Sequence, residues 1–82
     1  MKTRYKYIHF EKDSKIKPNN TSTWWVKNNR SNDEIGWVEW YERWRQYCFF
    51  PYADDAGNAY VVFSQDCLTD IIDFIKQLKE TP

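Results

Sequence analysis

The stretch that most constrains the fold runs from Ile35 to Pro51, IGWVEWYERWRQYCFFP. It concentrates Trp, Tyr and Phe, which favour strands, on both sides of a charged break at Glu42-Arg43. This pattern predicts a β-hairpin with Glu42-Arg43 as a two-residue turn, at the centre of a small sheet. Because Glu42-Arg43 is not a preferred two-residue turn, a three-residue loop is an alternative that would exchange the two faces of the hairpin.

Alternation of side chains divides this hairpin into two faces. With the two-residue turn, one face carries Ile35, Trp37, Tyr41, Trp44, Cys48 and Phe50. The other face carries Val38, Trp40, Tyr47 and Phe49. Gly36 interrupts the first arm, which predicts a β-bulge or a close backbone approach there. Both faces are aromatic, so a single covering layer would leave an apolar patch of the kind that marks interaction sites.

The rest of the chain adds further strands, connected by polar loops. Alternating or continuous apolar runs predict strands at residues 4–11, 23–27 and 60–63. The segments 12–22, 28–34 and 52–59 are rich in turn-forming residue types and are predicted to be loops. In the first strand, Ile8 and Phe10 are expected on one side. The opposite side is expected to carry Tyr5, Tyr7 and His9.

The C-terminal segment from Gln65 to Glu80 has the periodicity of an amphipathic helix, with Ser64 as its N-cap. Its apolar stripe is formed by Leu68, Ile71, Ile72, Ile75 and Leu78, with Cys67 and Phe74 beside it. The predicted fold is therefore α+β. Residues 1–82 form a single domain, a small antiparallel sheet of four to five strands with one C-terminal helix packed on one face.

Composition argues against several classes of function. The 12 Lys and Arg residues balance 12 Asp and Glu residues, so no overall field attracts nucleic acid or an anionic membrane. No apolar stretch is long enough to span a bilayer, and the alternating, charged N-terminal segment does not look like a signal peptide. We therefore expect a cytoplasmic protein with no membrane partner.

The chain also lacks a constellation of catalytic or metal-binding residues. His9 is the single histidine, and no nucleophile motif accompanies it. Cys48, Cys67 and one histidine are too few for a four-ligand zinc site within one chain. Both cysteines are predicted to be structural, buried thiols, with a disulfide or redox pair as the alternative. We expect no catalytic residues, no metal and no cofactor, and therefore no enzyme.

The main functional hint is the excess of aromatic residues, which make up 20% of the 82 residues. A domain of this size cannot enclose all of these rings, and Trp and Tyr are enriched at binding hot spots. The predicted partner-binding residues are Trp25, Trp40, Tyr41, Arg43, Trp44, Arg45 and Tyr47. The expected partner is a protein or a small signalling molecule. The alternatives are single-stranded nucleic acid, stacked on the rings beside the arginines, a homodimer interface, and rings merely half-buried at the margins of the sheet.

Two motifs carry a resemblance to a known group of proteins. They are W-Y-x-x-W-R-Q-Y-C-F-F-P, from Trp40 to Pro51, and C-L-x-D-I-I-D-F-I-K-Q-L, from Cys67 to Leu78. The chain resembles small uncharacterised proteins encoded by bacteriophages, prophages and other mobile elements of bacteria. The resemblance covers most of the chain and implies a context rather than an activity. It implies a phage or prophage accessory protein, located in the bacterial host cytoplasm, whose partner is a host or phage protein.

Overall fold

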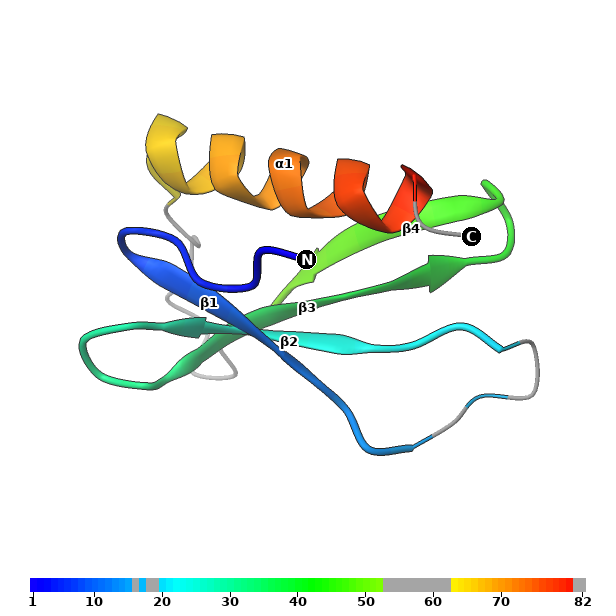
Figure 1. The fold of residues 1–82 in the computed structure, drawn as a ribbon, viewed down its shortest axis with the longest axis horizontal. Coiled ribbons are helices and arrows are strands. Elements are labelled where there is room, and N and C mark those ends of the chain that lie inside the picture. The colour runs from blue at the N-terminus through cyan, green and yellow to red at the C-terminus, as the bar shows by residue number, and fades with distance from the viewer. Residues whose placement is uncertain (16, 18–19, 53–62, 81–82) are drawn as a thin grey trace.

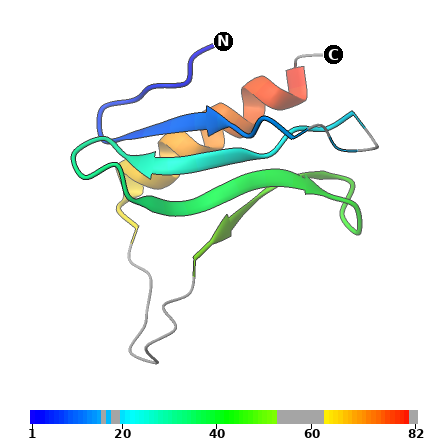
Figure 2. The ribbon, with the colours of Figure 1, turned by 90° about the horizontal axis from the view of Figure 1, so that it is seen from below.

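The computed structural model describes residues 1–15, 17, 20–52 and 63–80. These residues form a four-stranded antiparallel sheet and one C-terminal helix, an α+β fold as predicted. The strands are β1 (Ile8–Lys12), β2 (Trp24–Asn28), β3 (Glu34–Tyr41) and β4 (Gln46–Pro51), and the helix is α1 (Gln65–Glu80). The strands pair in the order of the chain, and α1 lies across one face of the twisted sheet (Figures 1 and 2). The strand expected at 60–63 and the loop expected at 52–59 fall largely outside the described residues.

The first strand is shorter than predicted because the chain turns back before it. The Tyr5 N–H donates to the Ile8 carbonyl at 2.8 Å, and the Phe10 N–H donates to the Thr3 carbonyl at 2.8 Å. Ile8 and Phe10 share the core side as predicted. The prediction that Tyr5 lies on the opposite side is wrong, since the turn brings its ring into the same core.

The central hairpin forms, but its predicted turn is wrong. Tyr41 pairs with Gln46, so residues 42–45 make the loop, and neither a two-residue nor a three-residue turn is present. Arg45 closes the loop in the left-handed region, at φ 52°. The shift relative to the predicted pairing is two residues, and side chains alternate with a period of two. The predicted division of the paired side chains between the two faces therefore survives the error in register.

Gly36 occupies a β-bulge, as its position in the sequence predicts. Val26 pairs with Gly36 but Lys27 pairs with Glu34, which leaves Ile35 as the extra residue of β3. Ile35 packs against the buried core, so its predicted place on the face of Trp37 is wrong. This correction follows from the bulge, because the extra residue breaks the simple alternation.

The core lies between the sheet and α1. Its most completely buried side chains are Phe74 from the helix and Ile8, Val26 and Val38 from the strands. The rings of Phe10 and Phe74 stack with their centroids 3.9 Å apart and an angle of 4° between their planes. The helix and the sheet thus meet through the aromatic contacts of Phe74, with aliphatic side chains around them.

Helix α1 begins at the predicted cap, since the Cys67 N–H donates to Ser64 Oγ at 3.1 Å. Its buried face is narrower than the predicted stripe. Around a helix that advances about 100° per residue, Leu68 and Ile72 lie roughly 120–160° from Phe74. They are 44% and 59% exposed, so placing them in the core stripe is wrong. No helix within the described ranges is long and apolar enough to cross a membrane.

Both cysteines are free thiols. Cys67, in the first turn of α1, is buried as predicted, and burial together with the nearby Asp70 carboxylate raises the pKa of its thiol. Cys48 lies in β4 and is only half-buried, so for this residue the expectation of a buried thiol is wrong.

Candidate functional site

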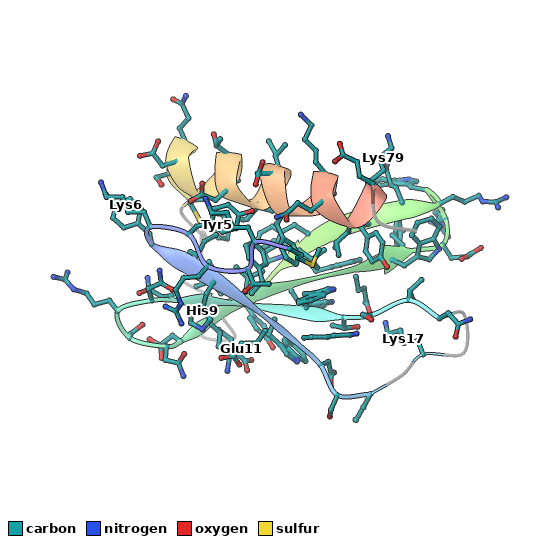
Figure 3. The ribbon with its side chains drawn as sticks, in the orientation of Figure 1. Tyr5, Lys6, His9, Glu11, Lys17 and Lys79 are labelled. Atoms are coloured by element: carbon teal, nitrogen blue, oxygen red, sulfur yellow. The ribbon has the colours of Figure 1, made fainter. Side chains whose placement is uncertain are left out.

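The side of the sheet away from α1 carries a run of contacting aromatic rings, which we call the aromatic face. It consists of Trp25, Trp37, Tyr41, Trp44, Phe50 and Tyr52. The strand register creates it, because Trp25 pairs with Trp37 and Trp37 pairs with Phe50 across adjacent strands. Figure 3 shows His9, Glu11 and Lys17 on this side of the sheet, whereas Tyr5 lies on the side of α1.

Trp37 is the centre of the aromatic face. Its ring stacks on Phe50 with centroids 5.3 Å apart and an interplanar angle of 7°. Trp25 and Tyr52 approach it at tilted angles, at 6.2 Å and 5.2 Å. Because Trp37 and Phe50 turn a ring face toward each other, each has one face fewer to offer to a ligand.

The aromatic face extends from Phe50 toward the hairpin loop. Tyr41 contacts Phe50 edge-to-face at 5.9 Å and Trp44 edge-to-face at 5.1 Å. Trp44 is 64% exposed and Tyr52 is 38% exposed, while the other rings of the face are half-buried. Edge-to-face and offset contacts are the favourable arrangements for aromatic pairs. The rings therefore support one another without a covering helix in the described part of the chain.

One margin of the aromatic face is an ion pair between neighbouring strands. Lys27 Nζ lies 2.7 Å from a carboxylate oxygen of Glu11, and His9 Nε2 lies 3.3 Å from the other. The hydrogen bond from Lys27, followed by that from His9, lowers the pKa of Glu11, and the bond to Glu11 raises the pKa of Lys27. The remaining nitrogen of His9 faces Asn29 Oδ1 at 2.6 Å, so this histidine is held inside a structural network.

A second margin is organised by Glu39, whose carboxylate joins a loop to the aromatic face. It forms an ion pair with Lys17 and accepts hydrogen bonds from Trp37 Nε1 at 3.2 Å and Thr23 Oγ1 at 3.3 Å. Burial alone would raise the pKa of Glu39. The pairing with Lys17 and the two hydrogen bonds outweigh burial, and the pKa of the carboxyl is lowered below its ordinary value of 4.5.

This lowered pKa predicts an acid-sensitive contribution to stability. A carboxyl whose pKa is depressed by folding stabilises the fold above its unfolded pKa, and the contribution is lost as the pH falls through the folded pKa. We expect Glu39→Gln to lower the free energy of unfolding by about 1 kcal/mol at pH 7, the scale of one part-buried charged hydrogen bond. The difference is expected to be smaller at pH 3 than at pH 7, because Glu39 loses its charge as the pH falls through its lowered pKa. Urea denaturation at both pH values measures it.

Glu80→Gln, at the exposed end of α1, is the matched control, because it removes the same charge without touching the Glu39 network. It is expected to change stability by less than about 0.5 kcal/mol at either pH. If Glu39→Gln lowers the free energy of unfolding as much at pH 3 as at pH 7, then the shape of the Glu39 side chain rather than its charge stabilises the fold.

The structure separates the predicted partner-binding residues into groups. Trp25, Tyr41 and Trp44 belong to the aromatic face. Trp40 and Tyr47 contact each other edge-to-face at 5.5 Å on the other side of the hairpin, where Tyr47 packs against the core.

Two further predicted residues, Arg43 and Arg45, are exposed in the hairpin loop. The predicted set lacked Trp37, Phe50 and Tyr52, which complete the face. Alternation in the hairpin already placed Trp37 and Phe50 beside Tyr41. Tyr52 was missed because it follows Pro51 in a segment with loop composition.

Comparison with known proteins finds no match of any kind. No family model matches the chain, and no curated protein or solved structure is significantly similar to it. Across the residues that the structure describes, no three His, Cys, Asp or Glu side chains are grouped so that they could hold a metal ion. The resemblance to phage and prophage proteins therefore stays a prediction, and function must be argued from the geometry.

Proposed function

We propose that this chain is a non-enzymatic accessory protein, of a phage or prophage, that binds a protein partner through its aromatic face. The observation that carries the proposal is the run of contacting rings on the side of the sheet opposite α1. Two of its members, Trp44 and Tyr52, are exposed. Trp and Tyr supply large, rigid contact area and dominate binding hot spots at protein interfaces.

The charges around the aromatic face favour a protein over single-stranded nucleic acid. Lys27 and Lys17 are neutralised by Glu11 and Glu39, and the chain as a whole has no net charge. Base stacking needs open ring faces beside free cations, whereas Trp37 and Phe50 turn ring faces toward each other. The exposed arginines of the hairpin loop are the features that keep nucleic acid as the second candidate.

A small signalling molecule is less favoured, because such ligands are bound in concave sites lined by apolar side chains. One pocket in the described part of the chain lies beside the loop between β1 and β2, away from the aromatic rings, and is lined by polar and charged residue types. It is formed by Lys12, Asp13, Ser14, Lys15, Asn20, Thr21 and Ser22.

The proposal predicts which tryptophan substitutions abolish partner capture. Trp25→Ala and Trp44→Ala remove rings from the aromatic face, and each is expected to weaken binding about 30-fold, the effect of a hot-spot residue worth about 2 kcal/mol. Quantitative capture from a bacterial lysate, read by mass spectrometry, compares each variant with the parent. Trp40→Ala is the matched control, because it removes the same side chain from the opposite side of the hairpin.

The expected result is a protein that is retained by Trp40→Ala, lost with both aromatic-face variants and unaffected by nuclease treatment. Circular dichroism verifies that each variant is folded. Equal retention by Trp25→Ala and Trp44→Ala would contradict the proposal. Nuclease-sensitive capture that is lost with Arg43→Glu and Arg45→Glu, and that falls steeply with salt, would favour the nucleic-acid alternative.

A further inference from the structure

The two edges of the sheet differ in how they are covered. The outer edge of β1 is occupied by the N-terminal segment, whose Thr3 carbonyl accepts from the Phe10 N–H and whose Tyr5 N–H donates to the Ile8 carbonyl. At the other edge, β3 is the one strand that pairs with β4 among the residues that the structure describes. Unpaired edge strands are templates for another strand, and natural proteins normally protect them.

The register identifies the backbone groups of β4 that point away from β3. The Tyr52 N–H donates to the Ile35 carbonyl, which makes this pair a hydrogen-bonded pair of the antiparallel ladder. Hydrogen-bonded and non-hydrogen-bonded pairs alternate, so the N–H and C=O of Tyr47 and Phe49 point away from β3. Within the described ranges, no hydrogen bond reaches these outward groups.

The side chains of β4 do not protect this edge. The strand reads QYCFFP and contains no charged residue, and Pro51 stands only at its end. Charged side chains are a common device that keeps edge strands from pairing. A second copy of the same strand would therefore meet no like charge, which makes β4 complementary to itself.

The flank of α1 on this side is also apolar. Gln77 bonds to Lys2 and Tyr5 of the N-terminal segment, which places that side of the helix toward β1. Leu68 lies nine positions before Gln77 and therefore about 180° around the helix, toward β4. Leu68 and Ile72 are both exposed, so the open edge of the sheet and an apolar flank of the helix lie at the same end of the strand order.

We propose that β4 is a homodimer interface, in which the β4 strands of two copies pair antiparallel about a two-fold axis at Cys48. In this register Tyr47 lies opposite Phe49 of the second copy, and their outward groups form backbone hydrogen bonds in both directions. Cys48 lies opposite Cys48 of the second copy in a non-hydrogen-bonded pair, with Cα atoms about 4.5 Å apart. The two sheets become one through backbone groups at the edge of β4, whereas the aromatic face is formed by ring side chains that extend across the sheet to Trp25 on β2.

A charge introduced at position 48 by substitution provides the test, because two-fold symmetry brings both copies of this residue together. Analytical ultracentrifugation of the full chain under reducing conditions, at about 100 µM, detects any dimer of roughly micromolar affinity. The parent and Cys48→Ser are expected to be dimers. Cys48→Lys and Cys48→Glu are each expected to be folded monomers, and an equimolar mixture of these two is expected to restore the dimer.

Disulfide trapping tests the register independently. A Cα separation of about 4.5 Å lies within the range that disulfides span. Brief oxidation with copper–phenanthroline is expected to link two copies of the parent, and the link is expected to disappear in Cys48→Ser, whose remaining thiol, Cys67, is buried. A parent that is monomeric at this concentration, or a Cys48→Lys variant that remains dimeric, would overturn the proposal. Trp25→Ala changes a ring on β2, away from β4. It is expected to lose capture through the aromatic face but to remain dimeric, so the two proposals can fail separately.

Discussion

Replacing Phe74 with alanine is expected to lower the free energy of unfolding by about 3–5 kcal/mol, the range for deleting a fully buried aromatic ring. Phe74 is 0% exposed, stacks on Phe10 at 3.9 Å and meets the edge of Trp24 at 5.1 Å. Its removal empties the centre of the contact between α1 and the sheet. A small domain has a free energy of unfolding of about 5–15 kcal/mol, so Phe74→Ala is expected to remove a large fraction of the stability of the protein.

Urea denaturation followed by circular dichroism measures the loss. Ile72→Ala is the matched control, since it truncates an apolar side chain of the same helix that is 59% exposed. It is expected to cost less than about 1 kcal/mol, since exposed positions lose little packing. Similar losses for the two variants would mean that α1 does not pack on the sheet through Phe74.

Gly36→Ala is expected to lower the free energy of unfolding by about 3 kcal/mol, at the upper end of the overpacking range. A Cβ at Gly36 would lie 2.5 Å from the Phe50 carbonyl oxygen and 2.7 Å from the ring of Phe49. The ring has limited room to move in the packed interior, and the oxygen belongs to the backbone of the adjacent strand. Relief of the clash would therefore require β3 and β4 to separate at the bulge.

The sign of the stability change caused by Gly36→Ala tests whether the bulge has room for a side chain. Where the backbone conformation and surroundings of a glycine accept a methyl group, replacing it with alanine stabilises the protein by about 0.4–1 kcal/mol, because the unfolded chain loses conformational freedom. The same urea experiment distinguishes the two outcomes. Glu34→Ala, at the exposed start of β3, is the control and is expected to change stability by about 0.5 kcal/mol or less. A stabilised Gly36→Ala variant would show that the bulge has room for a side chain.

Elements with strong local periodicity were predictable from the sequence. The helix was predicted with its observed ends, Gln65 and Glu80, because the apolar spacing and the Ser64 cap are properties of neighbouring residues. The division of the hairpin into two faces was also predictable. It withstood an error of two residues in the turn, since strand side chains alternate with a period of two.

The tertiary structure decided which of these local patterns form the candidate site. The sequence shows aromatic rings on both faces of the hairpin, but only the packing of α1 determines that Trp40 and Tyr47 lie on the helix side and that Tyr41 and Trp44 lie on the aromatic face. It likewise decided that Tyr52 completes that face through Trp37. These contacts join residues distant in the chain or follow a turn whose geometry the local sequence does not specify.

The sequence by itself therefore determined the class of fold, the helix, the bulge at Gly36 and the alternation that separates the hairpin faces. Each of these follows from interactions within a few residues or from the absence of a side chain. The tertiary structure alone decided the four-residue hairpin loop, the burial of Tyr5, the exposure of Leu68 and Ile72 and the place of β4 at the end of the described strand order. These features depend on which surfaces meet, because burial and strand pairing are set by the free energy of the whole packed molecule rather than by any one segment.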